Sequence, residues 1–466
     1  MKVLALKLDK FFKIKERGST IAKEILGGLT IFLAMVYVLP VNADMLSQTG
    51  MSFAAVFAAT AIAAAIASLV MGLLANYPVG LASGMGVNAF FTYTVVLTLQ
   101  FTWQEALAAV LISGVIFLVI SITGLRKLVI NAIPKNLKLA VGAGIGFFIA
   151  FIGLKNAGIV VSNAGTYVSL GDLGHPTVLL GIFGIVLVFI LFAIKKKLSR
   201  FAIIISIVVT GILGVIIGLI FPSVASLMPS IGGSNLGGIG DIGLTFGQAF
   251  KAIPSLLSNP LSYAVIFTFL FVDFFDTAGT LVAVGHDAGL LDKNGELIDG
   301  EKALLADATG TIVGAVLGTS TVTSYIESTT GIQSGARTGL AAVMVGLLFI
   351  ISLIFYPLFS IVGSVMVSSG VFYSPVTAMA LVFVGTLMFS SLKEIDWSDG
   401  IVVATTFITI ITMTLAFSIA EGIAFGFIFY VIMMLATPRR KEVSPVMYVL
   451  AGLFVINFII KVLFFI

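Results

Sequence analysis

Long apolar runs separated by short polar segments make up most of this chain. Hydrophobic residues account for 59% of the 466 residues and charged residues for only 10%, whereas a soluble domain carries about 25% charged residues. A hydrocarbon core of about 30 Å needs about 20 apolar helical residues per crossing. The strands of a membrane barrel would instead alternate over segments of about ten residues, and these runs do not alternate. We therefore expect an all-α polytopic membrane protein.

Basic residues gather in alternate loops between the predicted spans. No small-residue cleavage site follows the first apolar run, 25–39, which indicates an uncleaved span. The basic clusters are Arg126/Lys127/Lys135/Lys138, Lys195/Lys196/Lys197/Arg200, Lys293/Lys302 and Arg439/Arg440/Lys441. The loops in between, 155–176 and 221–260, hold only Lys155 and Lys251. The positive-inside rule then predicts a multi-pass protein of the cell membrane with residues 1–24 in the cytoplasm.

A segment rich in glycine and serine, 222–260, divides the chain into two halves. About seven apolar runs precede it, within 25–221, and about seven follow it, within 261–466. An odd number of spans in each half would make the two halves inverted repeats, with 222–260 as an extracytoplasmic linker. The run 447–466 counts as a fifteenth, which leaves the side of the C-terminus open.

Two aspartates lie inside one apolar run of the second half. The stretch 269–284 reads FLFVDFFDTAGTLVAV and contains Asp273 and Asp276. On a helix this spacing puts both carboxylates on one face, and a charge at the bilayer centre costs about 2.5–3.5 kcal/mol on insertion scales. We expect the pair to face a polar cavity, where a carboxyl that gains and loses a proton would serve a proton-coupled carrier. The alternative is that one aspartate caps a break in the helix.

Two other segments, 76–91 and 318–331, are too rich in glycine or hydroxyl groups to form continuous lipid-facing helices. Irregular backbone at membrane depth is tolerated only where it is buried in protein or lines a cavity. Paired broken spans in the two halves of a chain predict a binding site near the midplane. In 318–331 we expect residues 319–323 to be extended and a half-helix to follow, with Glu327 in its first turns. In 76–91, Asn88 offers a donor and an acceptor; alternatively it only caps a helix.

Aromatic residues flank these polar positions. Phe90 follows Asn88 closely, while Phe274 and Phe275 lie between the two aspartates. Aromatic faces can stack on a planar ligand, although ordinary packing is the alternative for each ring. Carboxylates, an amide, half-helix ends and aromatic rings together suit a flat, neutral, hydrogen-bonding solute.

Several other functions have no support in the sequence. Cysteine is absent, which excludes disulfides and thiolate metal sites. No Walker A sequence occurs, and the formal net charge of +4 does not suggest nucleic acid. We expect no metal and no cofactor other than the proton motive force, with sodium coupling left open. An intramembrane enzyme and a passive channel are the alternatives from other classes, and no catalytic arrangement emerges for an enzyme.

Specific strings resemble one family of transporters. They are VDFFDTAGTL, DKNGEL, LLADATGTIVGAVLGTSTVTSYIESTTGI, GARTGL, GMGVNAFFTY and ERGSTIAKEILGGLTIFLAMVYVLPVNADML. Together they are similar to the AzgA-like purine permeases, a branch of the nucleobase–cation symporter-2 family within the nucleobase–ascorbate transporter superfamily. The resemblance covers about residues 10–460.

The resemblance implies the uracil-permease fold. That fold has fourteen spans in two inverted seven-span repeats, and its third and tenth spans each contain a short strand and a half-helix. A core domain would comprise about 25–125 plus 261–356, and a gate domain about 137–221 plus 375–466. The substrate-binding positions implied by the family motifs are Asp273, Glu327, Asn88, Gly86, Thr323 and Ser324, and those implied for proton coupling are Asp273, Asp276 and Glu327.

The implied function is import of hypoxanthine, guanine or adenine by proton symport, with an elevator-like motion of the core domain. The partners would be a purine base and the lipid bilayer, and relatives of this fold often form homodimers. A carrier of the same fold for a pyrimidine base, xanthine, urate or an anion is the alternative. The sequence leaves open which purine is preferred and which of Asp273 and Asp276 carries the proton.

Overall fold

The structure is a computed structural model that describes residues 2–123, 132–194, 199, 201–230, 240–292, 297–359, 363–368 and 371–465. Several residues of the predicted basic loops lie outside the described ranges, namely Arg126, Lys127, Lys195, Lys196, Lys197, Arg200 and Lys293.

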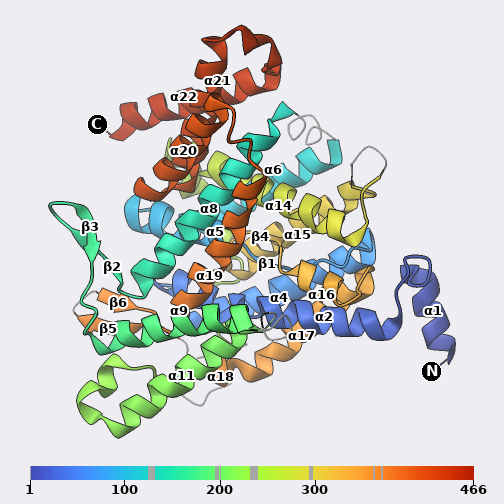
Figure 1. The fold of residues 1–466 in the computed structure, drawn as a ribbon, viewed down its shortest axis with the longest axis vertical. Coiled ribbons are helices and arrows are strands. Elements are labelled where there is room, and N and C mark those ends of the chain that lie inside the picture. Colours follow the sequence, from blue (N-terminus) through green and yellow to red (C-terminus); the bar gives the residue numbers. More distant parts are fainter. Residues whose placement is uncertain are drawn as a thin grey trace.

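The described chain is mostly helical (Figure 1). The helices of the first half are α1 (Lys2–Phe12), α2 (Ile21–Met35), α3 (Val38–Ser47), α4 (Phe53–Val70), α5 (Met85–Ala89), α6 (Trp103–Thr123), α8 (Lys135–Asn156), α9 (Pro176–Ile194) and α11 (Ala202–Ile220), with π-helical turns η1 (Met71–Ala75) and η2 (Phe90–Thr98). Those of the second half are α13 (Gln248–Ser258), α14 (Ser262–Ala288), α15 (Gly300–Leu317), α16 (Ser328–Gln333), α17 (Gly339–Ser352), α18 (Tyr356–Phe359), α19 (Ala378–Phe389), α20 (Gly400–Leu415), α21 (Ile419–Leu435) and α22 (Pro445–Phe465).

Eight helical segments of the described chain are long and apolar enough to cross a bilayer, and several shorter apolar helices accompany them. The multi-pass prediction is thereby supported, while fourteen spans and inverted repeats stay predictions. Hydroxyl side chains start several of these helices: Thr20 before α2, Ser52 before α4 and Ser418 before α21 each accept a hydrogen bond from a first-turn backbone N–H. Such caps satisfy donors that a helix leaves unpaired at its start.

Two short strands pair with each other in the middle of the protein. Strand β1 (Leu81–Ser83) pairs antiparallel with β4 (Val322–Ser324), with Ala82 opposite Thr323, and all six residues are buried. This pairing satisfies extended backbone that could not face lipid. The prediction of a strand followed by a half-helix in both broken segments is confirmed, although β4 begins three residues later than residue 319. Two other hairpins, β2 (Val160–Asn163) with β3 (Tyr167–Leu170) and β5 (Val365–Ser368) with β6 (Val371–Tyr373), lie at the left of Figure 1.

The helices pack as two groups. The first group surrounds the β1–β4 strands and consists of α2, α3, α4, α5, η2, α6, α14, α15, α16 and α17. The second group consists of α8, α9, α11, α19, α20 and α21, with α8 packed along α19 and α20. Glycines permit that close packing, since a Cβ on Gly146 of α8 would lie 2.7 Å from the Gly385 carbonyl oxygen of α19. The predicted core and gate domains are not tested by this packing and stay a prediction.

Some local expectations differ from the structure. Helix α14 is continuous through Asp273 and Asp276, so the alternative that one of them caps a helix break is wrong. Asn88 lies inside α5, which begins at Met85, so it is no helix cap either. Glu327 is the residue before α16 and not within its first turns. Part of 222–260, expected to be a linker, forms the amphipathic helix α13, which packs on α6. The last run forms α22, which packs on α21.

Candidate functional site

A cavity of about 830 Å³ lies where the two helix groups meet. The first group lines it with residues at the end of β1, on α14 and after β4, and the second group with apolar side chains of α8 and α19 such as Ile145 and Val384. From there the lining continues to Lys135, His286 and Glu394 at the ends of α8, α14 and the segment after α19. The cavity therefore reaches from the paired strands β1 and β4 to one end of the molecule, where Lys135 and His286 lie.

Glu327 lies at the inner end of this cavity. It lies three residues after the end of β4 and is only 7% exposed. Tyr37, the last residue of the turn between α2 and α3, donates a hydrogen bond from its hydroxyl to Glu327 Oε1 at 2.8 Å. Tyr325 lines the cavity beside it and donates to the Ser83 carbonyl oxygen of β1 at 2.5 Å. The Tyr37 hydroxyl thus holds the carboxylate, and the Tyr325 hydroxyl ties the segment after β4 to β1.

Asp276 of α14 lines the same cavity and interacts electrostatically with Glu327 and Asp307. A Cβ added at Gly84 would lie 3.6 Å from Asp276 Oδ2 and 2.8 Å from the Thr323 methyl group. Any larger residue at position 84 would therefore crowd the space between α14 and the paired strands β1 and β4.

Asp307 of α15 is a buried acid that the sequence analysis did not single out. It accepts hydrogen bonds from Thr277 Oγ1 at 2.6 Å and from Ser324 Oγ at 3.0 Å. Thr277 also contacts the Thr323 hydroxyl at 2.9 Å. One carboxylate therefore joins α14, α15 and β4 immediately behind the cavity wall. The signal available in the sequence was a single acid within an apolar run of small residues. In the structure this side chain is fully buried.

Two of the predicted binding residues lie behind the cavity lining. Asp273 is 1% exposed and accepts a hydrogen bond at 3.0 Å from Thr311, whose hydroxyl also reaches the Val322 carbonyl oxygen. Asn88 is fully buried and accepts a hydrogen bond at 2.9 Å from Ser83. Both side chains brace the strands from the rear, whereas Gly86, Thr323 and Ser324 line the cavity as predicted positions. The binding and coupling roles of all these residues stay predictions.

The aromatic residues divide in the same way. Phe274 and Phe275 line the cavity. Phe90 instead packs edge-on against Phe269, with ring centroids 4.9 Å apart, and is absent from the lining. A planar solute in the cavity could therefore contact the first two rings and not the third.

No basic side chain neutralises the cavity acids within the described residues. Among them, no Lys, Arg or His nitrogen lies within 4.0 Å of the carboxylates of Asp276 or Glu327. The part of the chain that the structure describes also holds no cluster of three His, Cys, Asp or Glu residues able to bind a metal. The cavity thus presents carboxyl and tyrosine oxygens, which accept from N–H groups and, when protonated, donate to ring nitrogens or carbonyl oxygens.

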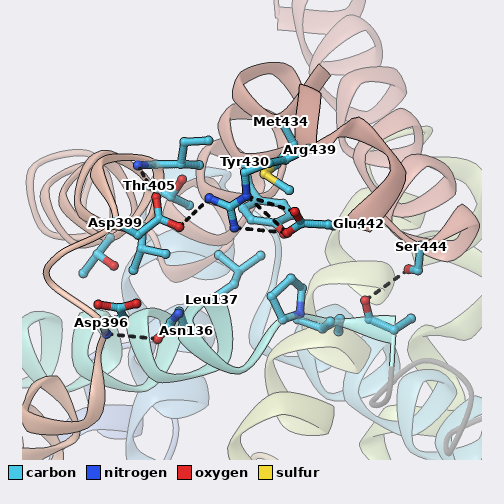
Figure 2. Close-up of a pocket in the computed structure, with 16 residues that line it drawn as sticks. Asn136, Leu137, Asp396, Asp399, Thr405, Tyr430, Met434, Arg439, Glu442 and Ser444 are labelled. Carbon is cyan, nitrogen blue, oxygen red and sulfur yellow. Dashed lines mark hydrogen bonds and ion pairs between the residues drawn. The ribbon is translucent and has the colours of Figure 1, made fainter. Parts of the chain in front are cut away.

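A second hollow, of about 430 Å³, lies between the start of α8, the first turns of α20 and the segment after α21 (Figure 2). Here Arg439 lies between two acids, with nitrogen–oxygen distances of 2.6 Å to Asp399 and 3.1 Å to Glu442. The hydrogen bond from Arg439 lowers the pKa of Asp399, while Glu442 and Asp399 raise the pKa of Arg439. Asp399 also caps α20 by accepting from the Ile401 N–H. These acids are satisfied by protein groups.

Comparison with known proteins identifies the chain. The model of the Permease family matches residues 22–425. The chain belongs to this family. The guanine/hypoxanthine permease PbuG of Bacillus subtilis is 44% identical over 97% of this permease and 99% of its own length. The adenine permease AdeQ of Escherichia coli is 39% identical over 97% and 96%, and the putative permease MJ0326 of Methanocaldococcus jannaschii 45% over 97% and 98%.

The resemblance to the purine permeases of the nucleobase–cation symporter-2 family is confirmed, and the chain is a permease and not an enzyme. Solved structures support the fold. The transmembrane domain of the cyanobacterial bicarbonate transporter BicA matches 86% of the permease and 97% of that domain, with a TM-score of 0.58 at 15% identity. The murine anion transporter Slc26a9 in its inward-facing state matches 89% of the permease and 68% of that chain, also with a TM-score of 0.58.

Proposed function

We propose that this permease imports purine nucleobases, with hypoxanthine, guanine and adenine as the candidate substrates. PbuG carries guanine and hypoxanthine in its name and AdeQ carries adenine, and both are similar to this chain over nearly its whole length. The observation that carries the proposal is the cavity itself, where Glu327 and Asp276 lie beside the paired strands and the rings of Phe274 and Phe275. A purine is flat, has ring N–H donors for carboxylates, and has π faces for the aromatic rings.

In this proposal Glu327 accepts the N–H groups of the base and Tyr37 holds its carboxylate in place. Thr323, Ser324 and the backbone at Gly86 complete the polar surface, while Asp273, Asn88 and Asp307 keep the strands and helices in position. A buried charge is costly unless a partner compensates for it. No basic side chain of the described residues pairs with the cavity acids, and the N–H groups of the base would take that place. Binding the base would therefore be strongly favourable in free energy.

Coupling to protons follows from the same electrostatics. Two carboxylates that share a desolvated space do not both ionise readily, so Asp276 can hold a proton while Glu327 binds the base. A loaded, protonated first helix group would carry little net charge through the bilayer and could slide against the second group in an elevator-like motion. The half-loaded group would carry an uncompensated charge and move rarely. Asp276 and Asp273 are both candidates for the proton-bearing residue, and sodium would act at the same oxygens.

An anion carrier of this fold is the second candidate, since the solved relatives of similar fold include a bicarbonate and an anion transporter. The charge of the cavity disfavours it, because two acids without a basic partner repel anions.

The test is uptake of radiolabelled hypoxanthine, guanine and adenine into cells that lack purine transporters, measured across external pH. Proton-coupled purine import predicts accumulation that rises as external pH falls and collapses with a protonophore. Accumulation of bicarbonate or sulfate and not of any purine would overturn the proposal, and purine entry without accumulation would indicate a channel.

A further inference from the structure

We propose that Asp44 and Ser374 form a latch that closes the cavity at the end opposite its mouth. The inference rests on the proposed alternating-access transport. The latch comprises Asp44 of α3 and Tyr93 of η2 from the first helix group, together with Lys155, Asn156 and Ser374 from the second.

The latch and the cavity mouth lie at opposite ends of the same two helices. Helix α8 is 22 residues long and runs from Lys135 at the mouth to Asn156 at the latch, a length of about 33 Å at about 1.5 Å per residue. Helix α19 runs the other way, from just after Ser374 to the mouth at Ser390. The cavity is therefore open at the basic end and sealed at the other.

The seal joins the two helix groups through polar contacts. Ser374 Oγ donates to Asp44 Oδ2 at 2.6 Å, and the hydroxyls of Ser364 and Thr377 also face this carboxylate. Tyr93 donates to Asn156 Oδ1 at 3.4 Å, and the Lys155 ammonium lies 4.4 Å from the centre of the Tyr93 ring. Asp44 and Ser374 are each only 2% exposed. To open this end, α3 and η2 would have to separate from α8 and from the segment before α19.

A carboxylate suits a seal that must reopen. In the closed state its charge is compensated by hydroxyl donors, and hydrogen bonds to an ionised acceptor are stronger than neutral ones. In the open state water takes over the same role. An apolar side chain here would favour the closed state only, because exposing it to water costs free energy. Asp44 thus keeps the two states close in free energy.

The chain contains no cysteine, so single introduced thiols report access directly. Ile149→Cys places a thiol on the α8 wall of the cavity, and a membrane-impermeant maleimide is added outside the cells. Ser374→Ala leaves the Asp44 charge buried with fewer donors and should raise the labelling rate about tenfold, the effect of losing one hydrogen bond to a charged group. Adding Asp44→Asn should return the rate toward its starting value, because a neutral amide is cheaper to bury.

The matched control is Ser47→Ala, which removes a hydroxyl that donates to the Asp44 backbone carbonyl oxygen and leaves the carboxylate contacts intact. Its labelling rate should equal that of Ile149→Cys alone. Equal rates in the Ser374→Ala variant and the control would overturn the latch. The maleimide readout needs no substrate, so a permease that labels as expected but fails to import purines would overturn the proposed function and leave the latch standing.

Cross-linking gives a second measurement if Ser374→Ala does not fold. A disulfide in the pair Asp44→Cys/Ser374→Cys should block uptake until reductant is added. The control pair Val161→Cys/Ser169→Cys joins two facing residues of the β2–β3 hairpin and should leave uptake unchanged. Full uptake by the cross-linked Asp44→Cys/Ser374→Cys pair would also contradict the latch.

Discussion

The two hollows of this permease both contain acidic residues, but these acids differ in their depth and in whether a basic side chain pairs with them. In the hollow of Figure 2, Arg439 binds Asp399 and Glu442, and all three side chains lie near the protein surface. In the central cavity, Asp276 and Glu327 lie deep between the helix groups, and no described basic side chain is within 4.0 Å of either. Paired surface charges contribute little and are usually structural. Buried acids that lack a cation cost free energy, and such groups usually mark a functional site.

The most direct test of this comparison is to neutralise single acids in each hollow, namely Glu327 or Asp276 in the central cavity and Asp399 in the hollow of Figure 2. We expect Glu327→Gln and Asp276→Asn each to lower purine uptake by about 100-fold, since each removes a charged acceptor from a buried site. Asp399→Asn should retain uptake within about twofold, because its carboxylate is solvent-accessible and serves Arg439. The measurement is initial uptake of labelled hypoxanthine, normalised to the amount of protein in the membrane. A comparable loss in all three variants would show that acidity alone does not distinguish the hollows.

The next effect concerns the acid behind the cavity wall. Asp307→Asn keeps the size of the side chain but removes one of the two oxygens that accept from Thr277 and Ser324. We expect uptake to fall about tenfold, because β4 and α14 would no longer be held in register beside Glu327. Combining this change with Ser324→Ala should add little, since both act on one hydrogen bond. Full additivity in the double variant would show that Asp307 acts elsewhere.

A smaller effect is expected from removing one hydroxyl that positions Glu327. Tyr37→Phe deletes the donor to Oε1 while keeping the ring, which should raise the KM for purine about fivefold. Tyr448→Phe is the matched control, because the Tyr448 hydroxyl donates only to the Arg440 carbonyl oxygen, beyond α21. Uptake kinetics over a range of substrate concentrations would separate KM from the maximal rate. An unchanged KM in Tyr37→Phe would remove Tyr37 from the site.

The smallest effect belongs to the ion pair of Figure 2. Arg439 holds the pKa of Asp399 below its ordinary value of 3.8, so the folded state binds the proton more weakly than the unfolded state. The stabilisation is therefore present above about pH 4 and is lost as pH falls through the lower, folded-state pKa. Thermal unfolding of the purified permease should show a small acid-side loss of stability that Arg439→Gln reduces, because only the backbone N–H groups of Ile401 and Val402 would then still lower the pKa of Asp399. An identical pH profile for both proteins would contradict the ion pair.

Sequence patterns pointed to several residues that line the central cavity, because membrane burial makes polar residues conspicuous. Asp276 and Glu327 stood out in apolar or broken runs, and the two strands were foreseeable because irregular backbone must be enclosed by protein at membrane depth. One spacing misled. Asp273 and Asp276 share a helix face by spacing, yet the first faces Thr311 and the second the cavity. Which side of that face meets the cavity depends on how α14 packs against α15, a long-range property.

Other residues were out of reach for the same reason. Tyr37 is one of ten tyrosines, and nothing local to it indicates a partner 290 residues away. Asp44 and Ser374 come from different halves of the chain and meet only through the packing of α3 against the segment before α19. A lone acid in an apolar run is a local signal, and Asp307 had one. The partner of a hydroxyl such as that of Tyr37 or Ser374, by contrast, can be identified only once the helix packing is known.

The central claim is that the cavity acids bind the base directly. Equilibrium binding of labelled hypoxanthine to the purified permease tests it without requiring transport. Wild type and Asp399→Asn should bind with the same Kd, whereas Glu327→Gln should bind about 100-fold more weakly. A Glu327→Gln protein that binds hypoxanthine as tightly as wild type would contradict this account.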